Sequence, residues 1–270
     1  MKLVDTLKYS TLAFACIAML TLGAATNVYA SPIPSGWTCS GTCGSLGADG
    51  VVPLSPIGSS SYQYVTTNGS SSTALLPSGS LGGETNGSTL ATSVFSATAG
   101  TDLNFYFDFV TSDGAGFADY AWAELYDSSN APVALLFTAR TVPSGSIVPG
   151  TGMPAPTATL NPTSVPIIGG GPAWSPLGVY SGSCYDSGCG YTGWIDSNFT
   201  IAAAGDYYLK VGVTNWSDTA FDTGLAMDGV TVGGTPIIPP AGPTPEPSTL
   251  TLLGTGLIGI YSAARRRLQA

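Results

Sequence analysis

The stretch LNFYFDF, at residues 103–109, decides the fold of this chain. Apolar side chains occupy its odd-numbered positions, and Asn, Tyr and Asp lie between them. Successive side chains of a strand point to opposite faces, so this alternation predicts a strand with one face in a core. The stretch YYLKVGV at 207–213 alternates in the same way. Two such strands imply a layered β fold, because each needs another sheet against its apolar face.

Similar short patterns occur through the middle of the chain, and turn-forming Gly, Asn, Asp and Ser residues separate them. No stretch of twelve residues has a convincing helical period. We therefore predict an all-β, single-domain fold of the β-sandwich or jelly-roll type. The further predicted strands cover 118–126, 133–138, 194–201 and 225–232, and the turns lie at 112–114, 128–130 and 204–206.

Composition agrees with a loop-rich β domain. The 270 residues include 36 Gly and 20 Pro, and charged residues make up 9%. We expect the folded domain to span 31–235, with a Pro- and Gly-rich excursion at 142–176 that is either a long surface loop or disordered. A Pro-rich linker follows at 236–244, and Pro favours extended backbone there.

The charge distribution restricts the possible partners. Residues 31–247 contain fifteen acidic side chains but only Arg140 and Lys210 as basic ones, a formal charge of −13. Such a surface repels nucleic acid and anionic lipid but suits divalent cations. The chain has no His, which excludes Ser-His-Asp and Cys-His catalysis and imidazole-based zinc sites.

Residues 1–30 have the features of a signal peptide. Lys2 and Lys8 form a basic start, 12–22 is apolar, and Val28 and Ala30 place small residues near the −3 and −1 positions. The apolar run is short for a membrane span, so we predict cleavage by signal peptidase after Ala30 rather than an uncleaved anchor.

Three unlike features follow one another at the C-terminus. The first is Pro245-Glu246-Pro247, the second is an apolar stretch at 250–264, and the third is Arg265-Arg266-Arg267. This order predicts a short transmembrane helix whose arginines stop translocation on the cytoplasmic side of the inner membrane. The Pro-Glu-Pro motif then lies just outside, within reach of a membrane peptidase.

The order resembles the PEP-CTERM sorting signal of Gram-negative bacteria that make extracellular polysaccharide. The resemblance covers residues 245–270 and implies that an exosortase recognises Pro245, Glu246 and Pro247 and cleaves near them. It also implies an inner-membrane precursor that moves to the cell surface or extracellular matrix. An ordinary C-terminal anchor is the alternative.

Several internal stretches are similar to a group of secreted β-sandwich proteins that carry PEP-CTERM tails. They are 106–114, 119–123, 213–216 and 221–230. That group has no firmly assigned activity, so the similarity implies an architecture and export, but no reaction.

Four cysteines remain after signal-peptide removal, and they allow three pairings. The spacings favour Cys39 with Cys43 and Cys184 with Cys189, in the oxidising environment of an exported protein. A zinc site of four cysteines is the alternative.

Some residues have the chemistry of a ligand site. Asp218, Asp222 and Asp228 lie within eleven residues, and Asp113 and Asp119 bracket a glycine-rich turn. Spaced carboxylates of this kind can bind calcium, although Asp also commonly forms turns. We expect no other cofactor.

Aromatic and acidic residues suggest two further possibilities. Trp122, Trp174, Trp194 and Trp216 either form a sugar-binding platform or pack in the core. A glycoside hydrolase needs two carboxylates, and no pair can be identified among fifteen acids. We therefore expect a non-enzymatic surface or matrix protein associated with exopolysaccharide, with a carbohydrate-binding module, or a carboxylate-based glycoside hydrolase, as the alternative.

Overall fold

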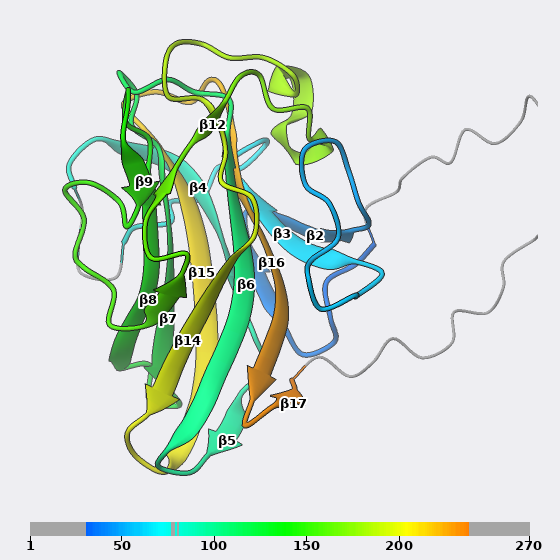
Figure 1. Cartoon of the computed structure of the whole chain (residues 1–270), viewed down its shortest axis with the longest axis vertical. Coiled ribbons are helices and arrows are strands. Elements are labelled where there is room, and N and C mark those ends of the chain that lie inside the picture. Colours follow the sequence, from blue (N-terminus) through cyan, green and yellow to red (C-terminus); the bar gives the residue numbers. More distant parts are fainter. Residues whose placement is uncertain (1–30, 77–78, 80, 238–270) are drawn as a thin grey trace, which may run out of the picture.

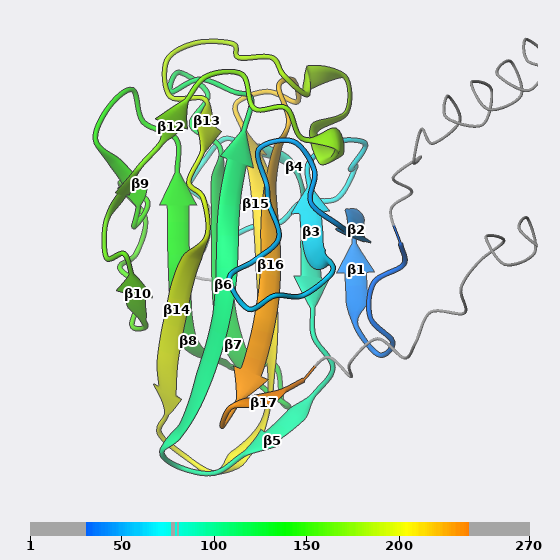
Figure 2. The ribbon, with the colours of Figure 1, turned by 45° about the vertical axis from the view of Figure 1, so that its right-hand side comes forward.

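Two β-sheets pack face to face in the computed structural model, which describes residues 31–76, 79 and 81–237 (Figures 1 and 2). The main strands of the nine-stranded sheet I lie in the order β10 (Thr159–Asn161), β14 (Ile195–Ile201), β6 (Thr101–Thr111), β16 (Thr223–Val232), β3 (Tyr62–Thr66) and β2 (Thr42–Leu46). The six-stranded sheet II has the order β1 (Thr38–Ser40), β4 (Glu84–Ala91), β15 (Gly205–Trp216), β7 (Tyr120–Asp127) and β8 (Pro132–Arg140).

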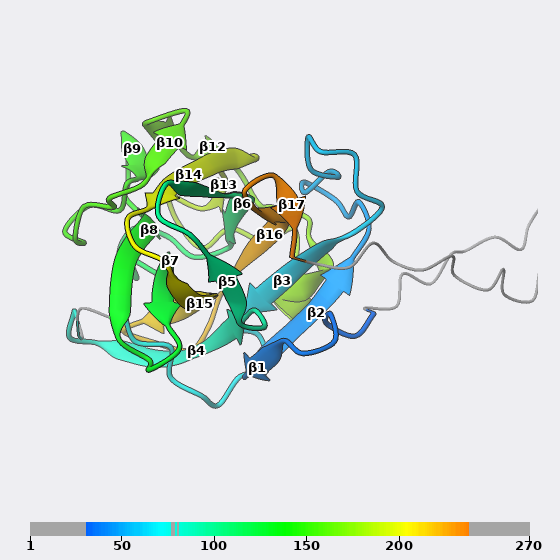
Figure 3. The same ribbon diagram turned by 90° about the horizontal axis from the view of Figure 1, so that it is seen from below.

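Short elements complete the fold. In sheet I, β13 (Gly190–Tyr191) pairs with β6 and with β12 (Ile168–Gly169), and β17 (Thr235–Pro236) pairs with β16; in sheet II, β5 (Phe95–Ala97) pairs with β15. A separate ribbon joins β9 (Ser146–Val148) to β11 (Val165–Pro166), and η1 (Ser175–Tyr180) is a 3-10 helix. Figure 3 views the two layers from the end where β5 and β17 lie. Neighbouring strands of both sheets pair antiparallel, as in a β-sandwich.

The alternating stretches form the centre of both sheets, so the predicted β-sandwich is confirmed. Residues 103–109 lie in β6 and 207–213 lie in β15. The odd-numbered side chains of β6 point inward, where Phe107 stacks on Phe137 of β8 with ring centroids 3.8 Å apart. From sheet II, β15 contributes Leu209, Val211 and Val213 to the same buried core. Full burial of each large apolar side chain contributes about 1.5–3 kcal/mol.

The Pro- and Gly-rich segment at 142–176 is partly built into the sandwich. Ile147 and Val148 of β9 and Leu160 of β10 are buried in the main core. β10 pairs with β14 at the edge of sheet I. Trp174, at the end of the segment, is fully buried and donates its indole N–H to the Tyr62 hydroxyl at 2.9 Å. Short apolar groups thus anchor a segment in which Pro and Gly obscure any strand pattern.

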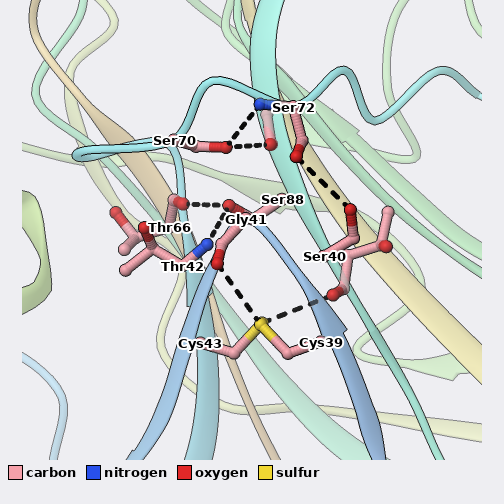
Figure 4. The surroundings of a disulfide bond; sticks show 11 residues. Cys39, Ser40, Gly41, Thr42, Cys43, Thr66, Ser70, Ser72 and Ser88 are labelled. Carbon is pink, nitrogen blue, oxygen red and sulfur yellow. Dashed lines mark hydrogen bonds between the residues drawn. A yellow bond between two sulfur atoms is a disulfide. The ribbon is translucent and has the colours of Figure 1, made fainter.

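The turn between β1 and β2 transfers the chain from sheet II to sheet I. The Cys39–Cys43 disulfide closes this turn, with 6.1 Å between the Cα atoms (Figure 4). The Thr42 N–H donates to Ser88 Oγ at 2.8 Å, and the Ser88 hydroxyl donates to the Thr66 carbonyl at 2.6 Å. Because Ser88 is in β4 and Thr66 in β3, these bonds link the two sheets beside the disulfide.

The end of the sandwich at which β6 ends and β16 begins carries several long loops, and we call it the loop end. It is the upper end in Figure 2. The Tyr185 N–H donates to the Ser112 carbonyl at 3.0 Å, and the Ser112 N–H donates to the Asp222 carbonyl at 3.1 Å. The Cys184–Cys189 disulfide closes one of these loops. Three loops are therefore joined at this end.

In the described residues, no helix combines the length and apolar character needed to span a membrane. The predicted signal peptide at 1–30, linker residues 238–244, Pro245-Glu246-Pro247 and Arg265-Arg266-Arg267 all lie outside them.

Candidate functional site

A groove of about 650 Å³ lies on the outer face of sheet I, toward the end opposite the loop end. Its floor is the outer face of β14, β6 and β16, which run side by side in Figure 2. The side chains that line it are Ile57, Thr101, Asp102, Asn104, Tyr106, Asp196, Asn198 and Thr231, with glycines at its rim. We call this feature the sheet I groove.

Strand register arranges the polar side chains of the floor in rows. Asn104 of β6 pairs with Asn198 of β14 and with Thr231 of β16. Two residues along β6, Tyr106 pairs with Asp196. Rows of this kind are about 7 Å apart along a strand. The groove therefore presents amide donors and acceptors beside one aromatic ring.

The two carboxylates of the groove differ in their surroundings. Asp102 accepts a hydrogen bond from the Thr200 hydroxyl at 2.7 Å and is exposed. Oδ1 of Asp196 is buried without a hydrogen-bond partner among the described residues, and burial raises the pKa of this side chain. Tyr106, the partner of Asp196, is four positions from Asp102, so the two acids lie about 13 Å apart along the strands.

A second depression, of about 470 Å³, lies on the outer face of sheet II. Tyr208 and Lys210 of β15 line it together with Asn130 and residues of β1 and β4. It places an aromatic ring beside a cation and many small side chains, so it offers fewer amide and carboxylate groups than the sheet I groove.

The loop end contains an acidic cluster, which we define as Asp113, Asp119 and Asp218. Asp113 and Asp119 are fully buried. Asp119 accepts hydrogen bonds from the backbone N–H of Trp216 at 2.8 Å and from the Thr223 hydroxyl. Burial, with the negative charges of Asp113 and Asp218, raises the pKa of Asp119 well above its usual range. Burial likewise raises the pKa of Asp113 to about 7, and the charge of Asp218 adds to the effect.

The structure does not bring together the predicted calcium ligands Asp218, Asp222 and Asp228. Asp222 accepts from the Thr67 hydroxyl at 3.0 Å, whereas Asp228 accepts from Ser55 on the outer face of sheet I. Asp228 lies six positions after Asp222 along the extended chain, which corresponds to about 20 Å. Of the three, Asp218 is the one coupled electrostatically to Asp113 and Asp119.

The tryptophans divide between core and surface. Trp122 and Trp174 are buried, and each indole N–H has a hydrogen-bond acceptor. Trp194 and Trp216 are partly exposed on different sheets, and Arg140 lies 5.3 Å from the Trp216 ring centroid. The four rings do not share one face, so they form no common platform.

Sequence reasoning did not identify Asn104, Tyr106 and Asn198 as groove residues. The signal was present in the even-numbered positions of 103–109, whose polar side chains have to face away from the core. What these positions could not show is which strands lie on either side of β6. Both predicted cysteine pairs, Cys39–Cys43 and Cys184–Cys189, are confirmed as disulfides.

Comparison with known proteins identifies the tail. Residues 243–267 match the family model of the PEP-CTERM protein-sorting motif. This match confirms the predicted sorting signal and includes Pro245, Glu246, Pro247 and the three arginines. No curated protein matches the chain.

Solved structures resemble the sandwich only distantly. The K1 cleaved adhesin domain of Lys-gingipain from Porphyromonas gingivalis W83 is 14% identical, with a TM-score of 0.35, over 76% of this chain and 95% of that one. A second similar structure is a carbohydrate-binding module of the β-sandwich superfamily, from work on the promiscuous specificity of these modules. It is 10% identical, with a TM-score of 0.33, over 76% of this chain and 61% of that one.

The enzymatically active domain of tailspike protein 4 from bacteriophage CBA120 is 12% identical, with a TM-score of 0.33. The match covers 74% of this chain but only 19% of the tailspike chain. These likenesses concern the fold alone. The chain is thus an exported protein that carries a PEP-CTERM protein-sorting motif on a β-sandwich ectodomain.

Proposed function

We propose that this protein is a non-enzymatic component of the cell surface or extracellular matrix that binds the producing cell's exopolysaccharide in the sheet I groove. The observation that carries the proposal is the row arrangement of Asn104, Asn198 and Thr231 beside Tyr106. Amide and hydroxyl groups both donate and accept hydrogen bonds, as sugar hydroxyls require. A flat aromatic ring stacks on the apolar face of a sugar.

The charge of the domain indicates the kind of polysaccharide. Asp102 and Asp196 lie in the groove, and basic residues are absent from its lining. A chain rich in uronic acid or sulfate groups would be repelled by these carboxylates and by the acidic domain as a whole. The proposal is therefore for a neutral polysaccharide, or a neutral stretch of a mixed one.

The position of the carboxylates supports binding over hydrolysis. Glycoside hydrolases place their two carboxyl groups roughly 5–10 Å apart. Asp102 and Asp196 are separated by about 13 Å of strand. Asp228 is closer to Asp196 across the sheet, but it is buried beneath Ser55 and does not line the groove.

Binding to the producer's own purified exopolysaccharide tests this proposal. Affinity electrophoresis of the exported protein should show retardation, and Tyr106→Ala or Asn198→Ala should weaken binding about tenfold or more, equivalent to about 1.4 kcal/mol. Tyr208→Ala is the matched control, because it removes a tyrosine from the depression on sheet II. If Tyr208→Ala abolishes retardation and Tyr106→Ala does not, the groove assignment is wrong.

A further inference from the structure

Asn215 is a buried polar side chain at the loop end whose amide group is unpaired. It is fully buried, and neither Nδ2 nor Oδ1 has a hydrogen-bond partner among the described residues. An unpaired buried amide costs about 1–3 kcal/mol, so such a group calls for an explanation. Oδ2 of Asp113 is also buried and unpaired.

The strand geometry directs Asn215 toward the acidic cluster. Its neighbours Thr214 and Trp216 both lie on the outer face of sheet II, where the Thr214 hydroxyl and the Trp122 indole N–H share the Ala74 carbonyl. Side chains alternate along a strand, so Asn215 points inward. Val213, two positions earlier and therefore on the same side of β15, is part of the core.

Asp119 enters the same interior space from the position just before the neighbouring strand β7. Thr214 and Tyr120 form the last pair of the β15–β7 ladder, and Asp119 directly precedes Tyr120 in the chain. Oδ1 of Asp119 accepts from the Trp216 N–H, and Oδ2 reaches across to Thr223 of sheet I. The Asp119 carboxylate therefore lies between the sheets and against the backbone beside Asn215.

Neither basic side chain of the domain faces this cluster. The Arg140 Nε donates to the Ala118 carbonyl at 3.2 Å, and its guanidinium lies over Trp216 on the outer side of sheet II. Lys210 lies 6.0 Å from the Tyr126 ring centroid. In the part of the chain that the structure describes, no basic side chain therefore balances the charges of the acidic cluster.

We propose that the loop end binds a Ca²⁺ ion through carboxylates of the acidic cluster and Oδ1 of Asn215. Ca²⁺ takes six to eight oxygen ligands in flexible geometry, and amide and backbone carbonyls serve alongside carboxylates. In the described residues, no three acidic side chains are arranged to hold a metal by themselves. The proposed site therefore depends on Asn215 and on loop carbonyls as much as on charge.

This site has a structural consequence for the loop after β15. Ser217 and Phe221 both adopt left-handed backbone conformations, with φ of 76° and 55°. Non-glycine residues rarely adopt this conformation, and it costs free energy. Asp218 lies in the same loop. An ion bound by Asp218 would stabilise this loop conformation and hold the loop next to the buried end of the sandwich. The proposal is independent of the polysaccharide groove, which lies toward the opposite end.

Ion binding to the exported protein tests the proposal directly. After EDTA treatment and dialysis, calorimetric titration should show one Ca²⁺ per chain, and Tb³⁺ should show luminescence sensitised through the adjacent Trp216. Asp113→Asn and Asn215→Leu should each weaken Ca²⁺ binding by about tenfold or more, because the first removes a negative charge and the second removes an oxygen ligand. Asn215→Leu should also raise the melting temperature in EDTA, since it replaces an unpaired amide by an apolar group of similar size.

Asp108→Asn is the matched control, since Asp108 is equally buried but faces Thr192 instead of the cluster. It should bind Ca²⁺ as the unaltered protein does. The inference is overturned if the unaltered protein binds no ion at millimolar Ca²⁺. It is also overturned if the folded Asp113→Asn and Asn215→Leu variants bind as well as the unaltered protein.

Discussion

Asp108 shows how a single buried carboxyl sets a pH dependence. Its side chain is fully buried on the outer side of β6, Oδ1 accepts from the Thr192 hydroxyl at 3.1 Å, and Oδ2 has no partner among the described residues. Burial raises the pKa of Asp108 to about 7. The nearby titratable group is Tyr62, whose pKa is raised above its usual range mainly by burial.

The direction of the resulting effect follows from proton binding. An unfolded Asp has a pKa near 3.9, so between about pH 4 and 7 the folded state binds more protons than the unfolded state. The contribution of Asp108 to stability is therefore fully present below about pH 4 and is lost as pH rises to about 7. In the unaltered protein this loss lowers the unfolding free energy by a few kcal/mol over this pH range, on the order of 1.4 kcal/mol per unit of pKa shift. Asp108→Asn should abolish this part of the pH dependence.

Urea unfolding at pH 5 and pH 8 measures this prediction. The unaltered protein should lose more unfolding free energy between the two pH values than Asp108→Asn does. Asp127→Asn is a suitable control, because Asp127 is partly exposed at the end of β7 and its pKa is lowered, first by the hydrogen bond from the Ser129 hydroxyl. Equal pH slopes for the unaltered protein and Asp108→Asn would mean that Asp108 is not buried as described.

At the scale of elements, the turn from β1 to β2 is the most sharply defined connection. Gly41, between the two cysteines, has a φ of 89°, and a Cβ there would collide with the Ser88 and Ser70 hydroxyls. Replacing Cys39 and Cys43 together by Ser should lower the unfolding free energy by about 2 kcal/mol, the loop-closure entropy of so small a ring.

Urea unfolding of the oxidised protein measures the disulfide contribution. Ser40→Ala is the control, because Ser40 is exposed at the start of the same turn and its hydroxyl donates to the Ser72 hydroxyl at the long distance of 3.3 Å. It should change stability by only a few tenths of a kcal/mol. A double Ser variant as stable as the unaltered protein would show that Ser88 and Thr66 hold the two sheets together without the disulfide.

The elements also show what could be predicted from the sequence. All six predicted strands are present. Apolar and polar residues alternate clearly in 103–109 and 207–213, whereas 133–138 (VALLFT) is a nearly continuous apolar run. β1 to β5 were not predicted, since strands such as β4 (ETNGSTLA) are rich in Gly, Ser and Thr and are buried by neighbouring strands and loops. Asn215 lies just beyond the strand predicted at 207–213, and only the positions of Thr223 and Asp119 reveal its surroundings.

At the scale of the whole molecule, the sorting tail makes the clearest prediction. The match at 243–267 includes Pro245-Glu246-Pro247. Glu246→Ala changes neither the apolar length nor the arginine cluster, so insertion in the membrane should survive it. In the native host, this precursor should accumulate in the inner membrane, whereas unaltered protein should lose its C-terminal segment.

Mass spectrometry of both ends of the chain checks this prediction. Mature protein should begin at Ser31 and lack Arg265 to Ala270. Thr244→Ala is the control, because it alters a residue beside the motif and leaves Pro245-Glu246-Pro247 intact. Mature protein that retains the arginines would identify the tail as a plain membrane anchor.

The strand order has a consequence for the timing of export. β15 lies between β4 and β7, and β16 lies between β6 and β3, so the last two long strands occupy the interior of the two sheets. A chain that emerges with its N-terminal end first exposes β3, β4, β6 and β7 before their partners arrive. Sheet II cannot close until Trp216 has crossed the membrane, and sheet I cannot close until Val232 has crossed it. Only twelve residues then remain before Pro245, so completion of the sandwich and arrival of the cleavage signal become nearly one event.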